Sequence, residues 1–257
     1  MATSLFKEII FGPMRSRRLG VSLGINLLPT DNKLCNFDCV YCECGWTKKG
    51  GKPRFIPAGS VREALEKKLS EMDEAGELPD VITFAGNGEP TMHPDFERIV
   101  DFAFDLRDRY APQAKIAVLS NATMIGSESV RRALGKVDRN ILKLDSAFDE
   151  TARLINGCPS SYSVAQTVEN MKLFHGDLII QTLFLRGEHD GRRIDNTTRT
   201  EVDAWLKLIA DIRPRQVMVY TIDRDTPAED LYKVTKSELE RIGERVRALG
   251  IDCQVAV

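Results

Sequence analysis

The feature that most constrains the fold is a regular alternation of short apolar runs with longer amphipathic stretches. Six apolar runs of four to eight residues recur along the chain, separated by segments with the helical spacing of apolar residues. Connections that contain a helix join parallel strands, and parallel strands are buried on both faces, so they read as continuous apolar runs. The sequence therefore predicts an α/β fold on a parallel sheet. The predicted strands are 21–27, 81–85, 115–119, 141–144, 178–185 and 216–220.

The amphipathic segments complete about six strand–helix units. Pairs such as Ser60 with Glu63 and Thr235 with Glu238 have capping-box spacing and predict helix starts. Because no linker-like stretch divides the chain, we expect residues 1–257 to form one domain, a partial (β/α)6 barrel of the TIM type. In such barrels the chemistry lies at the C-terminal ends of the strands. The predicted helices are 61–75, 95–108, 129–134, 164–174, 201–212 and 238–249, and a last apolar run covers 253–257.

The balance of charges limits the partners. Lysine and arginine number 36 against 38 acidic residues, so the formal net charge is −2 and no overall positive field attracts nucleic acid or anionic lipid. The apolar runs are too short to span a bilayer. Residues 1–10 include Lys7 and Glu8 and lack the apolar region of a secretory signal. We therefore expect a soluble, cytoplasmic protein with no membrane contact.

Four of the six cysteines fall within ten residues. In a reducing compartment, a cluster this tight indicates metal binding rather than disulfides. Cys35, Cys39 and Cys42 are spaced so that three thiolates can converge on one centre. A 4Fe–4S cluster normally takes four cysteines, so three would leave one iron open to another ligand. The alternative is a structural zinc site completed by Cys44 or a distant residue. The six are Cys35, Cys39, Cys42, Cys44, Cys158 and Cys253.

The segment Cys35-Asn-Phe-Asp-Cys39-Val-Tyr-Cys42, a C-x3-C-x-aromatic-C motif, resembles the signature of the radical S-adenosylmethionine (radical SAM) superfamily. The resemblance implies that these three cysteines hold a 4Fe–4S cluster whose fourth iron is chelated by the amine and carboxylate of SAM. It also implies that Tyr41 packs beside the adenine and that the fold is a partial (β/α)6 barrel. Residues 1–34 would then form the lead-in and first strand, and residues 35–44 the cluster loop.

A glycine-rich turn, Gly-Asn-Gly-Glu-Pro at 86–90, follows the second predicted strand. Glycines let a backbone approach a ligand closely, and Glu89 can accept a hydrogen bond from an ammonium group. The turn resembles the Gly-Gly-Glu-like motif of the family, with Asn87 in place of the first glycine. The resemblance implies that Asn87, Gly88 and Glu89 bind the amino group of SAM. The alternative is an ordinary strand-to-helix turn.

Two further strand ends carry polar residues. Asn121 follows the third predicted strand, and Lys143, Asp145 and Ser146 lie at the end of the fourth. Radical SAM enzymes use such positions for the ribose hydroxyls and the carboxylate of SAM, so the resemblance implies that role for all four. The alternative for each is turn chemistry or helix capping, which Asn, Asp and Ser also perform.

The segment 11–26, together with 86–94, is similar to a compact radical SAM group related to wybutosine-synthesising enzymes. Arg15, Arg17 and Arg18 are expected to reach an anionic group near the cluster, and the alternative is a solvated loop with ion pairs. The loop 221–227 is expected to close the barrel mouth. Because tRNA binding needs many phosphate contacts and the chain is nearly neutral, tRNA is a possible partner but not the favoured one.

The resemblance implies an iron–sulfur oxidoreductase that reductively cleaves SAM to a 5′-deoxyadenosyl radical. The radical would abstract hydrogen from an unidentified substrate, either a small molecule or a short exposed segment of a macromolecule. The electron would come from a reductant such as flavodoxin or ferredoxin. Three alternatives remain: a glycyl-radical activating enzyme, a tRNA-base-modifying enzyme of wybutosine type, and a non-catalytic zinc-binding protein.

Overall fold

The computed structural model describes residues 5–16, 19–48, 50 and 54–256. Its main element is an eight-stranded sheet in which seven strands run parallel and follow one another in chain order. The remaining strand, β1, pairs antiparallel with β2 at one edge, and β11 forms the other edge. Within the described ranges β1 and β11 do not pair, so the barrel is open. The strands of this sheet are β1 (Ile10–Ser16), β2 (Gly20–Ile25), β3 (Val81–Phe84), β4 (Lys115–Ser120), β5 (Arg139–Lys143), β6 (Ile179–Leu183), β9 (Gln216–Tyr220) and β11 (Asp252–Ala256).

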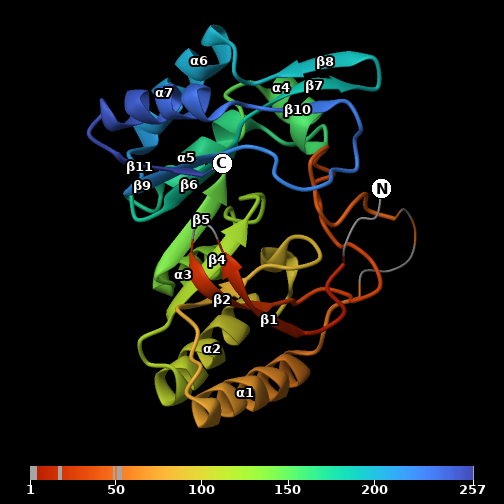
Figure 1. Ribbon diagram of the computed structural model, residues 1–257, viewed down its shortest axis with the longest axis vertical. Helices are drawn as coiled ribbons and strands as arrows, with labels where there is room; N and C mark the ends of the chain where they lie inside the picture. The colour runs from red at the N-terminus through yellow and green to blue at the C-terminus, as the bar shows by residue number, and fades with distance from the viewer. Residues whose placement is uncertain (1–4, 17–18, 49, 51–53, 257) are drawn as a thin grey trace.

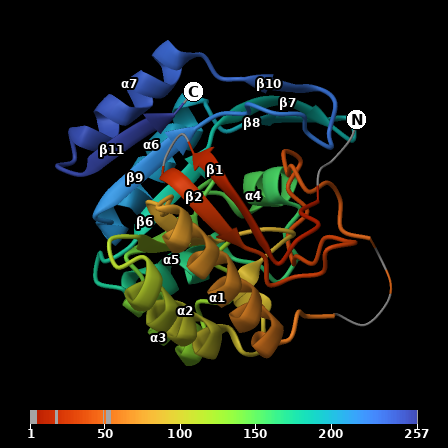
Figure 2. The same cartoon turned by 60° about the horizontal axis from the view of Figure 1, so that its bottom comes forward.

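Helices cover the outer face of the sheet (Figures 1 and 2). Neighbouring helices pack against one another, as α1 does on α2 and α6 on α7. The predicted partial (β/α)6 barrel is therefore confirmed, and β11 adds one further parallel strand after the sixth unit. None of the helices in the described ranges is long and apolar enough to cross a bilayer. The helices are α1 (Ala58–Ala75), the short 3-10 helix η1 (Pro90–Met92), α2 (Phe96–Tyr110), α3 (Glu128–Lys136), α4 (Asp149–Asn156), α5 (Val164–Lys172), α6 (Arg199–Ile212) and α7 (Lys236–Arg247).

The two faces of the parallel strands bury different apolar layers. Side chains alternate along a strand, so Ile82 and Phe84 of β3 join the core under the helices while Val81 faces the interior of the barrel. Five of the strands each contribute one side chain to this interior layer, which fills the barrel toward the N-terminal ends of the strands. The C-terminal ends are left for polar side chains. The interior layer is Val81, Ala117, Ile141, Ile179 and Met218.

A second sheet of three short antiparallel strands was not predicted from the sequence. It comprises β7 (Leu185–His189), β8 (Arg192–Asp195) and β10 (Leu231–Lys233), in the order β10-β7-β8. Half of the residues in these strands are charged, and the strands lack the apolar runs that identify buried strands. They lie beyond the C-terminal ends of β6 and β9, where Leu185 and Ile194 pack with Val40 of the cysteine loop. The small sheet therefore forms part of the rim of the barrel mouth.

One predicted helix start is wrong. Helix α1 begins at Ala58 with Pro57 as its N-cap, so Ser60 lies inside the helix and caps nothing. By contrast, Thr235 and Glu238 form the predicted capping box at the start of α7. The Pro57 carbonyl accepts the first helical hydrogen bond, from the Val61 N–H at 3.1 Å, so the helix begins directly after this proline.

Candidate functional site

The cysteine loop lies between β2 and α1 and is held by the glycine-rich turn that follows β3. Leu34 forms a parallel bridge with Gly88: its N–H donates to the Asn87 carbonyl at 2.8 Å, and its carbonyl accepts from the Glu89 N–H at 3.2 Å. Gly88 has φ +141°, and a Cβ there would lie 1.8 Å from the Leu34 carbonyl oxygen. Only glycine fits this approach. The turn therefore positions the start of the cysteine loop.

All six cysteines are free thiols, and the three of the motif differ in how deeply they are buried. Cys39 is buried, whereas Cys35 and Cys42 are partly exposed. The backbone N–H of Phe37 donates to Cys35 Sγ at 3.4 Å, and the Asn156 amide donates to Cys39 Sγ at 3.5 Å. Hydrogen bonds to sulfur are one way in which proteins tune thiolate-ligated iron.

The thiols differ in their acidity. Burial raises the pKa of Cys35 well above its ordinary value and that of Cys39 to about 11. A hydrogen bond from Cys44 is the main reason that the pKa of Cys42 falls to about 6, and the same bond raises the pKa of Cys44. Cys44 Sγ also lies 3.3 Å from the Gly86 carbonyl oxygen, a second acceptor for the same thiol hydrogen, so the end of the cysteine loop lies against the glycine-rich turn.

Lys33 was missed by the sequence analysis, although it is the charged side chain most closely enclosed by the cysteine loop. Its side chain is 2% exposed, and Nζ donates to Asp38 Oδ1 at 3.1 Å and to the Gly45 carbonyl at 2.9 Å. Burial alone would lower its pKa, but the charges of Cys42, Cys35 and Cys39 outweigh burial and raise the pKa. The only signal in the sequence was a lysine two positions before the first cysteine.

Glu89 is 2% exposed and joins the glycine-rich turn to the end of β4. Its Oε1 accepts from the Thr91 backbone N–H at 3.1 Å, from the Thr91 hydroxyl and from the Ser120 hydroxyl at 2.9 Å. Its Oε2 accepts from the Asn121 backbone N–H at 2.6 Å. Burial raises the pKa of this carboxyl despite these bonds. Since a carboxylate oxygen carries two lone pairs, Oε2 can accept a second donor.

The two predicted asparagines have different surroundings. The Asn121 amide lies beside the first cysteine, donating to Cys35 Sγ at 3.7 Å and to Asn36 Oδ1 at 2.7 Å. The Asn87 amide instead donates to the carbonyls of Phe6 at 2.9 Å and Pro29 at 2.8 Å. Asn87 therefore ties the N-terminal segment to the glycine-rich turn, and its side chain is not directed at the thiols.

A second polar group at the end of β5 brings Tyr41, Lys143 and Asp145 together. The Tyr41 hydroxyl donates to Asp145 Oδ2, and the Lys143 ammonium lies 3.6 Å from the same oxygen and 5.0 Å from the Tyr41 ring centroid. The amide of Asn156 also donates to Asp145 Oδ2 at 2.7 Å, and Lys143 Nζ donates to the Tyr220 hydroxyl at 3.4 Å. Asn156 and Tyr220 were not predicted, because only the fold brings α4 and β9 to this point.

Charge compensation within this group keeps Lys143 protonated. Burial would lower its pKa, yet Asp145, Tyr220 and the Cys39 thiol raise it well above its ordinary value. Desolvation also raises the pKa of Tyr41, with a further contribution from the charge of Asp145. The arrangement is therefore a cation and a carboxylate held between two phenols, next to one of the three thiols.

Ser146 is buried, but its hydroxyl is directed to α6. It donates to Glu201 Oε2 at 2.8 Å and accepts from the Phe148 backbone N–H at 2.9 Å. Thr151 donates to the other oxygen of Glu201 at 2.6 Å. The structure thus groups the three cysteines with Tyr41, Glu89, Asn121, Lys143 and Asp145, whereas the side chains of Asn87 and Ser146 are bonded elsewhere.

The expectation that Arg15 reaches an anion near the cysteines is wrong. Strands β1 and β2 form a hairpin in which Arg15 pairs with Val21, at the N-terminal end of β2. The cysteine loop leaves the opposite end of that strand, so the hairpin carries this exposed arginine away from the site. Arg17 and Arg18, which were given the same role, lie outside the described residues.

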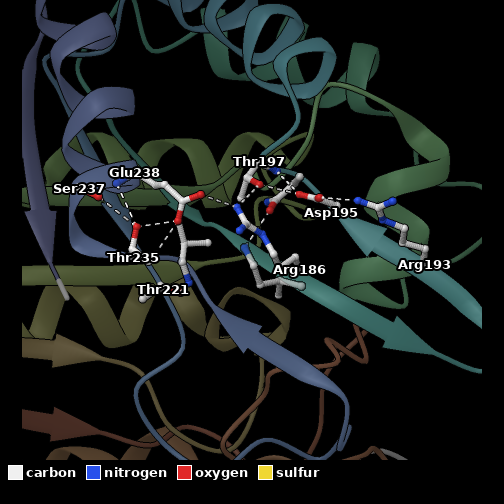
Figure 3. Close-up of polar contacts among 11 residues, drawn as sticks. Arg186, Arg193, Asp195, Thr197, Thr221, Thr235, Ser237 and Glu238 are labelled. Atoms are coloured by element: carbon white, nitrogen blue, oxygen red, sulfur yellow. Dashed lines mark hydrogen bonds and ion pairs between the residues drawn. The ribbon is translucent and has the colours of Figure 1, made fainter.

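The predicted mouth loop, 221–227, lies against the cysteine loop. Arg224 Nη1 is 2.6 Å from Glu43 Oε2, and the Ala228 N–H donates to the Val40 carbonyl at 3.2 Å. Figure 3 shows how the neighbouring small sheet is fixed: Arg186 on β7 donates to Glu238 Oε1 at 2.9 Å and to the Thr197 hydroxyl at 2.7 Å. The rim is therefore bonded both to the cysteine loop and to the start of α7.

The donor set of the cysteine loop fits a sulfur-ligated iron cluster. Three free thiols lie on one loop, N–H groups donate to two of them, and a buried lysine supplies positive charge beside them. Over the described part of the chain, no three His, Cys, Asp or Glu side chains are arranged around a single metal ion.

Comparison with known proteins gives a family match over most of the chain. The model of the radical SAM superfamily matches residues 32–197. A UPF0026 protein of Methanocaldococcus jannaschii is 34% identical over 183 residues, which are 69% of this chain and 54% of that protein. A protein named GTPase Obg from Brachyspira hyodysenteriae is 27% identical over 236 residues, which are 90% of this chain. The chain thus spans about half of the first relative and 32% of the second.

Solved structures show the same fold. A radical SAM methyltransferase from Sphaerobacter thermophilus matches with a TM-score of 0.68 at 15% identity, covering 91% of this chain and 65% of that one. SuiB from Streptococcus suis, bound to S-adenosylmethionine, matches with a TM-score of 0.63 at 14% identity, covering 91% of this chain and 50% of that one. At these identities the likeness extends to the architecture alone.

Proposed function

This chain belongs to the radical SAM superfamily, and from that premise we propose that it cleaves SAM reductively at a 4Fe–4S cluster held by Cys35, Cys39 and Cys42. When bound, the cluster would supply one electron that breaks a carbon–sulfur bond of SAM, giving methionine and a 5′-deoxyadenosyl radical that takes a hydrogen atom from the substrate. The observation that carries the proposal is the convergence of the cysteine loop, the Glu89 turn and the β5 end at one mouth of the barrel.

The buried polar groups suggest how SAM is oriented. We assign the amino group of SAM to the turn containing Gly88 and Glu89, because Oε2 of that carboxylate can accept a second donor. The carboxylate of SAM suits Lys143, a cation beside the cysteines. Tyr41 and Asp145 then hold that cation in place. Asn87 and Ser146 contribute through the backbone turns that they brace.

Access to the site runs past the rim formed by loop 221–227 and the small sheet. We propose a small molecule, or a short exposed segment of a macromolecule, as substrate, with residues 1–257 acting as one domain. A flavodoxin or ferredoxin would deliver the electron. We propose a cytoplasmic location, since a reducing compartment keeps a thiol-rich loop unpaired.

The experiment is anaerobic reconstitution followed by incubation with SAM and dithionite. We expect brown protein with about four iron atoms per chain and formation of 5′-deoxyadenosine. Cys39→Ala should lose both, whereas Cys158→Ala and Cys253→Ala, at buried thiols outside the loop, should keep both. Colourless protein that carries zinc would support the alternative of a non-catalytic zinc-binding protein. A stable cluster in Cys39→Ala would overturn the ligand assignment.

A further inference from the structure

Lys33 is a buried cation that the chemistry proposed above does not use. Its side chain is 2% exposed, and it has two hydrogen-bond partners in the loop: Asp38 Oδ1, between the first two cysteines of the motif, and the carbonyl of Gly45, which directly follows Cys44. Asp38 Oδ1 also accepts from the Thr47 N–H at 2.8 Å. Lys33 therefore closes the cysteine loop from inside.

The charge of Lys33 is not cancelled by its ion pair. Asp38 is 37% exposed, so water screens its carboxylate, whereas the ammonium of Lys33 has almost no contact with water. A charge enclosed by protein acts on its neighbours more strongly than one in solvent. Lys33 Nζ lies 3.1 Å from Oδ1 of Asp38, the neighbour of Cys39, and 2.9 Å from the carbonyl oxygen of Gly45, the neighbour of Cys44. Lys33 thus places a fixed positive charge inside the loop that carries the sulfur ligands.

We propose that Lys33 is a positioning residue whose buried charge raises the reduction potential of the cluster held by Cys35, Cys39 and Cys42. This inference rests on the proposed function. The net charge and hydrogen bonding around an iron–sulfur cluster set its potential. Three thiolates and one added electron increase the local negative charge, so a fixed cation nearby favours the reduced state. Lys33 would in this way bring the cluster within reach of a flavodoxin-type donor.

A purely mechanical role makes a different prediction. If Lys33 only holds the loop in shape, then breaking its ion pair from either side should disturb the cluster in the same manner. An electrostatic role predicts opposite signs, because Lys33→Met removes a positive charge and Asp38→Asn removes a negative one. Asparagine keeps an oxygen that can accept from Lys33 and from the Thr47 N–H, so the loop geometry is preserved.

The test is the midpoint potential of the reconstituted protein without SAM, from a dithionite titration followed by electron paramagnetic resonance. We expect Lys33→Met to shift the reduction equilibrium at least tenfold toward the oxidised cluster, about 59 mV for one electron. Asp38→Asn should shift it the other way, by less, because its carboxylate is screened. Lys207→Met, an exposed change on α6, should leave the potential unchanged.

Equal potentials in all variants, or shifts of the same sign in Lys33→Met and Asp38→Asn, would overturn the inference. If Lys33→Met fails to load iron, the inference is tested with Asp38→Asn and the charge-preserving Lys33→Arg instead. An Asp38→Asn variant whose midpoint potential equals that of the wild type contradicts the electrostatic role. A wild-type protein that holds no cluster would instead contradict the proposed function, so the two failures are distinguishable.

Discussion

Three charged side chains, Lys33, Glu89 and Asp145, are each no more than 3% exposed, and all three contact residues of the candidate site. A buried charge is costly unless it is paired and hydrogen-bonded. Each one meets that condition differently: Lys33 through a carboxylate and a carbonyl, Glu89 through four donors, and Asp145 through a phenol, an amide and an ammonium. Burial of this kind concentrates electrostatic effects at the candidate site.

Replacing Glu89 by glutamine should weaken both the fold and SAM binding. The amide group of Gln places a donor where the carboxylate now accepts from Thr91, Ser120 or the Asn121 N–H. A mispaired buried donor costs about 1–3 kcal/mol, and the free energy of unfolding should fall by that amount in urea. SAM affinity should fall by about ten- to a hundredfold if Oε2 binds the ammonium. Lowered stability with unchanged SAM affinity would leave Glu89 a purely structural role.

Among the elements, the glycine-rich turn and the cysteine loop depend on one close backbone contact. Gly88→Ala would place a methyl group 1.8 Å from the Leu34 carbonyl oxygen at φ +141°, so one of the two segments must move. We expect a loss of at least about 2 kcal/mol in the free energy of unfolding, together with reduced iron loading. Chemical denaturation and iron analysis measure both.

Gly59→Ala is the matched control for that change. Gly59 lies in the first turn of α1, and nothing lies within 4 Å of the added methyl group. Alanine restricts the unfolded chain and suits a helix, so stability should rise by about 0.5–1 kcal/mol. Equal effects of the two substitutions would contradict the role assigned to the Gly88–Leu34 contact.

The start of α7 should contribute a pH-dependent part of the stability. Hydrogen bonds from Thr235 and Arg186 lower the pKa of Glu238 to about 2. The unfolded chain then binds this proton more readily than the folded one, so the contribution is present above about pH 5 and is lost as the pH falls toward 2. The stability difference between the wild type and Glu238→Gln, followed by urea denaturation at pH 6, 4 and 3, should shrink with acidity. Glu244→Gln, at an exposed position of α7, serves as the control, and a pH-independent difference would refute this assignment.

At the scale of the whole molecule, the barrel was predictable because its strands are buried on both faces. Runs such as 115–119 carry that pattern in the sequence itself, and β4 (Lys115–Ser120) matches it closely. The strands β7, β8 and β10 were missed because their charged residues become strands only when Leu185 and Ile194 meet the cysteine loop. Their stability comes from a tertiary contact that leaves no periodic signal.

The site was predictable to the extent that its residues lie in local motifs. The cysteines, the Glu89 turn and the polar ends of β4 and β5 follow from spacing along the chain. The burial of Lys33 does not, because it depends on Asp38 and the Gly45 carbonyl folding around one ammonium. The prediction for Arg15 was wrong for a similar reason. A hairpin reverses the chain before β2 and places that arginine at the opposite end of the barrel.

The charges around the rim bear on the class of substrate. Among the described residues there, Arg224 pairs with Glu43 at 2.6 Å, Lys233 with Asp223 at 3.7 Å, and Arg193 with Asp195 at 3.2 Å. Cations that already face carboxylates offer little net field to a polyanion. We therefore expect weak tRNA binding that depends little on salt.

The measurement is fluorescence anisotropy of labelled tRNA with the reconstituted protein between 50 and 200 mM salt. A protein that contacts six to ten phosphates loses roughly a thousandfold or more in affinity across that range. A rim of paired charges should instead give less than about a tenfold change, from a low starting affinity. Tight binding at low salt that falls steeply as the salt concentration rises would show that the protein contacts many phosphates of the tRNA. The mouth of the barrel would then be shaped for nucleic acid, and modification of a tRNA base would replace the small-molecule proposal.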